Sequence, residues 1–239
     1  MNTIKFEKGN TRVVAHRGLS GIERENTNSA FVAAGNRSYY GIETDVHRTA
    51  DGKFVICHDF DLARVSGENI PVEQSTLADL QSVILNNCIG PRDRVDLRTP
   101  TLENYADICK KYEKHCVLEL KSYFSEDELR RIIEIFAERD YLENTTFISF
   151  EYDNVVRMRN LLPDQSVQFL WGDFGDGLLD ALASMHIDID IVAHILTKEI
   201  VDKIHAKGLK VNCWTVDSKE DAEKLAEWGV DFITTNILE

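Results

Sequence analysis

Residues 116–140 read CVLELKSYFSEDELRRIIEIFAERD, and this stretch contains one strand followed by one helix. The first six residues form a short, mostly apolar run that is typical of a buried strand. Ser125 is a favourable helix N-cap, and Glu128 three residues later completes a capping box. The apolar residues that then recur at helical spacing are Leu129, Ile132, Ile133 and Phe136. The stretch therefore predicts a strand at 116–121 and an amphipathic helix at 125–140.

The same alternation of strand and helix runs through most of the chain. Further strands are predicted at residues 11–16, 41–46, 145–150, 166–171, 187–193, 209–216 and 230–236. About eight such units favour a closed (β/α)8 TIM barrel over an open, doubly wound sheet. An open sheet would be favoured by G-x-G-x-x-G after the first strand. HRGLSGIEREN at residues 16–26 lacks that pattern.

Residues 59–100 interrupt this alternation. They contain turns, polar residues and at most one short helix, near residues 76–85. The segment is too long for an ordinary connecting loop, so it is either an insertion over the barrel mouth or a small subdomain. No linker separates it from the rest, and residues 1–239 are therefore predicted to form a single barrel domain with an insertion after strand two. Because the last strand has no full helix after it, we expect residues 1–10 to cover part of the gap.

The composition indicates a soluble globular protein. The chain has 239 residues, of which 43% are hydrophobic, and this suffices for one well-buried core. No apolar stretch is long enough to span a bilayer, and the N-terminus lacks a signal-peptide core. We therefore expect a cytoplasmic protein without stable membrane insertion.

The net charge of −14 argues against nucleic acid and anionic membranes as partners, although a pocket cation or basic side chain can still bind a small anion. The five cysteines form no C-x-x-C pair, so buried free thiols are expected rather than a zinc site or a disulfide framework. The sequence does not indicate an oligomeric state.

Acidic residues occupy strand positions where apolar residues are expected. Glu43 and Asp45 share one face of a strand by period-two geometry, and Glu119 lies on the next barrel strand. Three converging carboxylates repel one another unless a cation neutralises them, and oxygen ligands suit Mg²⁺ or Ca²⁺. The sequence therefore predicts a divalent metal site. An ion network of these carboxylates with Arg17, Lys121 or Arg48 is the alternative.

Two histidines and two basic residues complete the candidate site. His16 follows the first strand, and His58 follows the Asp-Gly hairpin that begins at the second strand. A histidine pair can remove a proton from a nucleophile and donate one to a leaving alkoxide near neutral pH. Arg17 and Lys121 would bind a phosphate. This set suits metal-assisted cleavage of a phosphodiester.

The other histidines are interpreted as solvated or hydrogen-bonded spectators. They are His47, His115, His186, His194 and His205. His47 is placed in the turn after the second strand, as a residue at the rim of the site. Phe150, at the end of the fourth strand, is interpreted as core packing.

At these residues the sequence resembles the glycerophosphodiester phosphodiesterase family. The matching motifs are HRG (16–18), ENT (25–27), ETDV (43–46), TADG (49–52), VICHD (55–59), PTLE (100–103), ELK (119–121) and WTV (214–216). They run in order through nearly the whole chain. The family usually has Pro before ENT, whereas this chain has Arg24, which would alter the loop or add a charge near the mouth.

The resemblance implies a TIM barrel with a segment inserted after strand two. It implies hydrolysis of glycerophosphodiesters, in glycerol and lipid metabolism, to glycerol 3-phosphate and an alcohol with a divalent metal. The implied roles are an acid/base pair at His16 and His58, metal ligands at Glu43, Asp45 and Glu119, phosphate contacts at Arg17 and Lys121, and a glycerol contact at Trp214. The attacking group is either the neighbouring glycerol hydroxyl or water.

Two other functions remain open. A lysophospholipase D-like enzyme would need an apolar entrance, and VILNNCIG at residues 83–90 is the only moderately apolar part of the insertion. A catalytically inert barrel that binds phosphorylated ligands would be favoured by loss of a histidine or a metal ligand, and none is lost. Lys121 could form a Schiff base in an aldolase, but the neighbouring charges fit a phosphate site better.

Overall fold

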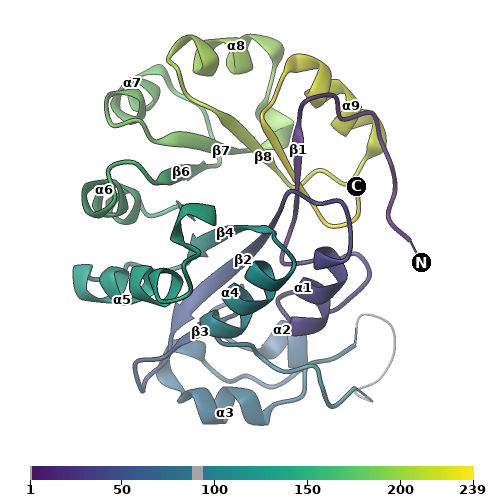
Figure 1. Ribbon diagram of the computed structural model, residues 1–239, viewed down its shortest axis with the longest axis vertical. Helices are drawn as coiled ribbons and strands as arrows, with labels where there is room; N and C mark the ends of the chain where they lie inside the picture. The colour runs from purple at the N-terminus through teal and green to yellow at the C-terminus, as the bar shows by residue number, and fades with distance from the viewer. Residues whose placement is uncertain (1, 88–93) are drawn as a thin grey trace.

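The computed structural model describes residues 2–87 and 94–239 and contains a closed, eight-stranded parallel barrel (Figure 1). The barrel strands are β1 (Arg12–Ala15), β2 (Gly41–Arg48), β4 (His115–Leu120), β5 (Thr145–Ser149), β6 (Ser166–Trp171), β7 (Asp188–Val192), β8 (Val211–Trp214) and β9 (Phe232–Thr235). Neighbouring strands pair in chain order, and β1 closes the barrel by pairing with both β2 and β9. This architecture confirms the predicted (β/α)8 barrel.

Helices lie outside the strands, as Figure 1 shows for α5 to α9. The barrel helices are α1 (Asn28–Gly35), α4 (Leu102–Lys111), α5 (Glu126–Ala137), α6 (Tyr152–Leu161), α7 (Asp176–Ser184), α8 (Lys198–Ala206) and α9 (Lys219–Trp228). Two short 3-10 turns are η2 (Leu142–Asn144) and η3 (Ala193–Ile195). Helix α4 was not predicted, although Thr101 caps it and Asn104 completes a capping box.

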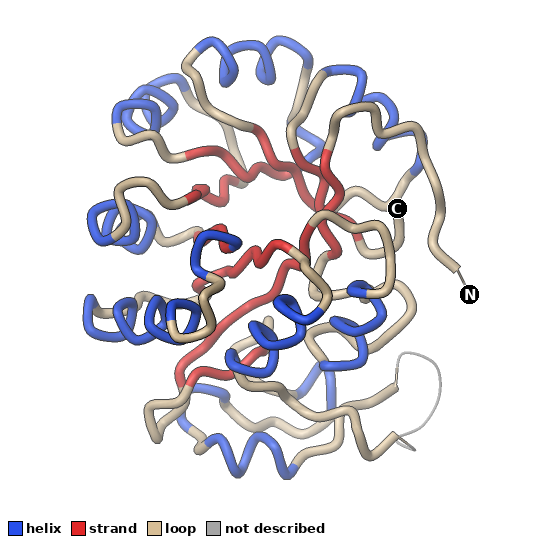
Figure 2. The backbone as a smooth tube through the Cα atoms, in the orientation of Figure 1, coloured by secondary structure: helices blue, strands red, loops and turns tan. Residues whose placement is uncertain are grey.

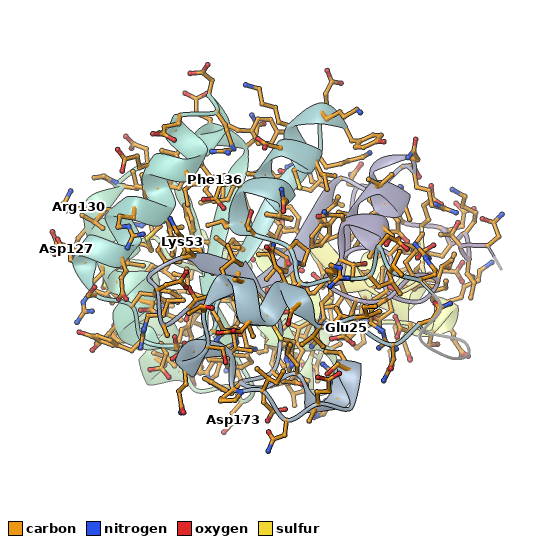
Figure 3. All side chains as sticks on the ribbon, turned by 90° about the horizontal axis from the view of Figure 1, so that it is seen from below. Glu25, Lys53, Asp127, Arg130, Phe136 and Asp173 are labelled. Carbon is orange, nitrogen blue, oxygen red and sulfur yellow. The ribbon has the colours of Figure 1, made fainter. Side chains whose placement is uncertain are left out.

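Helix α5 shows why the predicted amphipathic pattern faces the barrel. Its N-cap Ser125 accepts from the Glu128 amide, as the capping box predicts. Phe136 is fully buried and lies within the molecule in Figure 3, whereas Asp127 and Arg130 extend from the outer face of the helix. The apolar stripe therefore docks the helix on the sheet, and the charged side chains remain in solvent.

The hairpin after β2 also forms as predicted. Strand β3 (Phe54–Ile56) pairs antiparallel with β2, and the Thr49 amide donates to the Lys53 carbonyl at 2.8 Å across the turn. Gly52 has a φ of +71°, a conformation that glycine adopts without strain. The hairpin carries the chain out of the barrel and places His58 back over the barrel mouth.

The insertion at 59–100 shares a second apolar core with the hairpin before it, and so resembles a small subdomain more than a simple loop. Figure 2 shows its short helices and loops beside the barrel. The insertion contains α2 (Ala63–Ser66), the 3-10 turn η1 (Val72–Gln74) and α3 (Leu77–Ser82). The prediction of at most one short helix was therefore wrong. The side chains of this second core include Val55, Leu62, Val72, Leu80 and Leu97. Part of the apolar stretch 83–90 lies outside the described residues.

The N-terminal segment lies against the residues that follow β9, in the gap left because no full helix follows that strand in the described residues. Ile4 forms a parallel bridge with Leu238, and the Glu239 amide donates to the Ile4 carbonyl at 2.8 Å. Phe6 is buried in the main core. These contacts fulfil the expectation that residues 1–10 cover part of this gap.

The described cysteines are buried and free, namely Cys57, Cys109, Cys116 and Cys213, while Cys88 lies outside the described residues. In the described part of the chain, no helix has the length and apolar character needed to cross a bilayer.

His115 is a half-buried titratable group at the amino-terminal end of β4. Its ring stacks on Tyr40 at 5.0 Å, and its Nε2 lies 2.8 Å from the Thr146 hydroxyl. Burial, and then the charges of Arg12 and Lys210, lower the pKa of His115 from 6.5 to about 4. The folded protein therefore keeps this ring neutral at pH values where the unfolded chain protonates it.

Replacing His115 should change how stability depends on pH. Between pH 4 and 6.5 the unfolded chain binds a proton that the folded protein excludes, so His115 makes stability rise with pH in this range. We expect the stability of the wild type relative to His115→Gln to fall by about 2 kcal/mol between pH 8 and pH 5. Urea unfolding at both pH values measures this difference. Equal pH dependence in the two proteins would contradict the assignment.

Candidate active site

A cavity of about 50 Å³ opens at the carboxyl ends of the barrel strands. Six of the eight predicted site residues line it: His16, Arg17, Glu43, His58, Glu119 and Trp214. Asp45 and Lys121 lie next to these residues, since Lys121 Nζ is 2.8 Å from Glu119 and Arg17 Nε is 3.5 Å from Asp45. The fold therefore brings all eight residues to one place, at the end of a barrel where active sites are found.

Glu43, Asp45 and Glu119 form a buried carboxylate cluster. One oxygen of each lies within 4.8 Å of the others, and the three residues are 3%, 1% and 7% exposed. Asp45 on β2 stands opposite Glu119 on β4, so strand pairing fixes their proximity. Burial and the Asp45 carboxylate raise the pKa of Glu43 well above its ordinary value and that of Glu119 to about 8. The cluster resists carrying three negative charges at once.

Two cations partly neutralise this cluster. Lys121 Nζ lies 2.8 Å from Glu119 and 3.6 Å from Asp45, and Arg17 Nε approaches Asp45. Burial alone would raise the pKa of Asp45, but Arg17 and Lys121 hold it below its ordinary value. Arg48 takes no part, because it pairs with carboxylates outside the cavity. The ion network considered from the sequence is thus present for two of its three cations.

The donor set fits a hard divalent cation. Two basic side chains face three carboxylates, and Arg17 also pairs with Glu25 at 2.8 Å, so full ionisation of the cluster would leave negative charge in excess. Asp45 Oδ1 is buried and has no hydrogen-bond partner in the part of the chain that the structure describes. Such an oxygen is available to a metal ion. Oxygen ligands of this kind are those that Mg²⁺ and Ca²⁺ prefer.

The loop after β1 holds the carboxylates through its backbone. Arg17 has a φ of +54°, and its amide donates to Glu43 Oε2 at 2.8 Å. Gly18 follows with a φ of +75°, and a Cβ there would lie 2.7 Å from the backbone of Ala30. Only glycine fits this position, which explains the HRG sequence. Asn26 donates from its side chain to Asp45 Oδ2 at 2.7 Å and so ties the ENT segment to the same cluster.

Hydrogen bonds determine which nitrogen of His16 faces the cavity. Asn236 Nδ2 donates to Asp217 at 2.6 Å, so Asn236 presents its oxygen to His16 Nδ1 at 2.8 Å. Nδ1 therefore carries the proton, and Nε2 faces Glu43 at 4.0 Å with its lone pair free. Burial, and then Arg17, lower the pKa of His16 to about 4. His16 is thus neutral near pH 7 and able to accept a proton.

His58 has a different partner. Its Nδ1 lies 2.6 Å from Asp59 Oδ1, and a carboxylate oxygen only accepts, so this nitrogen carries a proton. Burial, and then the Arg17 and Lys121 charges, lower the pKa of His58, while Asp45 and Asp59 oppose that shift. A carboxylate bonded to the far side of an imidazole stabilises its protonated form. His58 is therefore the better proton donor of the pair.

Arg64 of the insertion joins the two loops that carry the histidines. Its guanidinium bonds to both oxygens of Glu25 at 2.7 and 2.8 Å, and its Nε donates to Asp59 at 2.6 Å. Glu25 in turn accepts from Arg17 at 2.8 Å. Burial alone would raise the pKa of Glu25, but these bonds lower it to about 2. A continuous chain of charged hydrogen bonds thus connects Arg17 with His58.

Removing Arg64 should disturb both ends of this chain. We expect Arg64→Ala to lower kcat/KM by about tenfold to a hundredfold. Without this side chain Arg17 and His58 can shift, and small displacements of reacting groups slow a reaction strongly. Arg64→Lys should recover only part of this loss, since an ammonium cannot bond to both carboxylates with a planar fork. Steady-state kinetics with circular dichroism as a folding check measures the effect. Unchanged kcat/KM in folded Arg64→Ala would exclude the positioning role.

Trp214 lies between the cavity and a larger groove of about 330 Å³ that α9 borders. Its ring meets Phe150 edge-on at 5.6 Å, and its indole Nε1 donates to the Asp190 carbonyl at 3.5 Å. Phe150 is 46% exposed and lines the cavity. The interpretation of Phe150 as core packing was therefore wrong, because the residue lies beyond the end of β5.

The structure also corrects the placement of His47. This residue belongs to β2, not to the turn, and it is fully buried. Its Nδ1 lies 3.2 Å from Glu73 and its Nε2 3.4 Å from the His58 carbonyl. It is hydrogen-bonded, as expected, but it packs beneath the insertion because β2 extends two residues further than predicted.

Arg24, where the family usually has proline, does not add a charge to the mouth. Its Nε donates to the Asn86 carbonyl at 2.5 Å, and a terminal nitrogen donates to the Asn87 carbonyl at 3.0 Å. These bonds attach the loop after β1 to the insertion.

Sequence reasoning missed several residues that shape the site. Asp190 lines the cavity from β7, and its signal was the same period-two alternation of acidic residues that drew attention to Glu43. Asn236 follows the last strand directly, at the end where site residues gather. Arg64 gave no signal, because its role depends on contact with loops far away in sequence.

The fold and the site define a (β/α)8-barrel protein with a carboxylate cluster and two histidines at the mouth of the barrel. Residues 16–239 match the sequence model of the glycerophosphoryl diester phosphodiesterase family, and the chain belongs to this family.

Named relatives and solved structures agree with this membership. The glycerophosphodiester phosphodiesterase of Caldanaerobacter subterraneus subsp. tengcongensis is 28% identical, over 95% of this chain and 94% of its own. An Oleispira antarctica phosphodiesterase, solved with the product sn-glycerol-3-phosphate, is 25% identical with a TM-score of 0.86, covering 94% of this chain and 92% of its own. A glycerophosphodiester phosphodiesterase from Parabacteroides distasonis is 29% identical with a TM-score of 0.80, covering 96% and 94%.

Proposed function

We propose that this protein hydrolyses glycerophosphodiesters to glycerol 3-phosphate and an alcohol, with Mg²⁺ or Ca²⁺ as cofactor. The observation that carries the proposal is the convergence of a buried carboxylate cluster with two differently bonded histidines in one cavity. Family membership supports the reaction class. The product held by the Oleispira antarctica relative supports glycerol 3-phosphate as the product here.

Glu43, Asp45 and Glu119 would hold the cation. A divalent cation supplies a Lewis acid that withdraws charge from the phosphate. Arg17 and Lys121 contribute two more positive charges beside the cluster, where they would bind the phosphate oxygens. The buried position of these residues excludes water and strengthens each charge interaction.

His16 is the proposed general base. Its Nε2 faces the cavity unprotonated, because Asn236 accepts the proton of Nδ1. Its pKa of about 4 keeps the ring neutral in the free enzyme. His16 would remove the proton of the attacking hydroxyl, which belongs to the substrate glycerol or to water.

His58 is the proposed general acid. Asp59 holds its Nδ1 proton and stabilises the ring when Nε2 is also protonated. The Nε2 proton would pass to the oxygen of the leaving alcohol as the P–O bond breaks. The chain of hydrogen bonds through Arg64 and Glu25 fixes the position of this ring relative to Arg17.

We also propose that residues 1–239 act as one domain, with the hairpin contributing His58 to the site and the insertion contributing Asp59 and Arg64. The protein acts in the cytoplasm, which the four described free thiols support.

Product analysis tests the reaction. Glycerophosphocholine should give glycerol 3-phosphate and choline, detected by phosphorus NMR with a metal ion present. Formation of phosphocholine and glycerol would place the cleavage at the wrong ester bond and contradict the proposal. Cleavage of lysophosphatidylcholine without cleavage of glycerophosphocholine would favour the lysophospholipase D-like alternative.

A further inference from the structure

Asp190 is a buried acid in the cavity, and it is not among the proposed metal ligands, phosphate contacts, general base or general acid. It lies on β7 and is 2% exposed, and it lines the cavity together with Trp214 and Thr234. Its neighbours Ile189 and Ile191 are fully buried in the main core around the barrel. The alternation of the strand therefore directs Asp190 into the barrel.

One carboxyl oxygen of Asp190 is without a hydrogen-bond partner among the described residues. Asp190 Oδ1 forms no hydrogen bond with any residue that the structure describes. The other polar side chains inside this part of the barrel bond to one another: Asn212 donates to Gln168 at 3.3 Å, and Thr234 donates to Asn212 at 3.2 Å. A buried carboxyl oxygen without a partner is costly, so its retention at the wall of the cavity points to a ligand.

Asp190 is separate from the carboxylate cluster. Strands β5 and β6 lie between β4 and β7, and they present the apolar side chains of Ile148 and Leu170 to the cavity. The three clustered carboxylates meet within 4.8 Å of one another, and Asp190 is not one of them. Burial, and then the Glu119 charge, raise the pKa of Asp190 well above its ordinary value. A neutral carboxyl can both donate and accept a hydrogen bond.

We infer that Asp190 binds the terminal hydroxyl of the glycerol moiety and so selects diesters whose glycerol carries a free hydroxyl at that end. This inference rests on the proposed function. The phosphate is held at the wall formed by β1, β2 and β4, and the glycerol carbons extend from it along Trp214 and the apolar wall. The hydroxyl furthest from the phosphate then reaches β7. Trp214, which bonds to the Asp190 backbone, shapes the same subsite.

A pair of substrates tests this role. Glycerophosphocholine is compared with the phosphocholine ester of propane-1,2-diol, which lacks only the terminal hydroxyl, and kcat/KM is measured for both. The wild type should prefer the glycerol compound by about tenfold or more, the effect of one buried hydrogen bond. Asp190→Leu should abolish this preference by losing rate on the glycerol compound alone. Asp190→Asn should retain most of it, since an amide can also bond to a hydroxyl.

Gln168→Leu is the matched control. It removes a buried polar side chain from inside the barrel without touching the cavity, so the substrate preference should stay at the wild-type value. A preference in Asp190→Leu equal to that of the wild type would overturn the inference. If the wild type cleaves neither substrate, the proposed function itself fails. Loss of metal affinity in Asp190→Asn, measured by calorimetry, would assign Asp190 to the metal instead and also overturn the inference.

Discussion

His58→Ala is expected to lower kcat by roughly 10²- to 10⁴-fold while leaving the fold intact, and His16→Ala should do the same. The physical reason differs for the two residues. Without His16, no neutral imidazole faces the cavity to accept the proton of the nucleophile. Without His58, the leaving alkoxide departs without a proton. The measurement is the rate of glycerol 3-phosphate release at saturating substrate with metal present.

His205→Ala is the matched control for this pair. His205 lies on α8 outside the barrel, where its Nε2 is 2.9 Å from Asp231. Its replacement should leave kcat unchanged. If folded His16→Ala or His58→Ala turns over substrate at a rate near that of the wild type, that residue is neither the base nor the acid.

Glu43→Gln is expected to weaken metal binding without lowering the stability of the protein. The amide keeps the shape of the side chain but removes one of three negative charges, so affinity for Mg²⁺ or Ca²⁺ should fall by about tenfold or more. In the presence of chelator the variant should unfold at the same temperature as the wild type or higher. This follows because burial and Asp45 disfavour the charged form of Glu43. Calorimetric titration and thermal unfolding measure the two effects.

Glu199→Gln, on the exposed first turn of α8, controls for the loss of a carboxylate far from the cavity. It should bind metal as the wild type does. Metal affinity that is equal in Glu43→Gln and the wild type would remove Glu43 from the ligand set. A large loss of stability of Glu43→Gln in chelator would indicate that Glu43 has a structural role instead.

Much of the fold follows from local sequence patterns. The predicted barrel strands agree with the structure to within about two residues, because each carries a short apolar run bounded by turn residues. Helix α4 was missed even though Leu102, Tyr105, Ala106 and Cys109 recur at helical spacing, since it directly follows the irregular insertion. The second core of the insertion could not be predicted. It joins residues such as Val55 and Leu97 that meet only after the hairpin has folded back.

Site residues could be predicted where a single strand carries the pattern of acidic residues. They could be predicted less well where the site forms by contact between loops. Glu43 and Asp45 are two residues apart, so strand geometry alone places them together. The bond between Arg64 and Glu25 joins residues 39 positions apart and depends on two loops. Asp190 alternates with Asp188 on the same strand, but this pattern alone does not show that Asp190 faces the barrel interior. Asn236 acts through His16, a contact between residues 220 positions apart.

The most direct test of the account is metal dependence of glycerophosphodiester cleavage. The protein is treated with chelator, and release of glycerol 3-phosphate from glycerophosphocholine is measured before and after addition of Mg²⁺ or Ca²⁺. We expect that release stops with chelator, returns with at least one of the two ions, and does not return in His58→Ala. Release that continues at the original rate in chelator would contradict the assignment of Glu43, Asp45 and Glu119 to a catalytic metal.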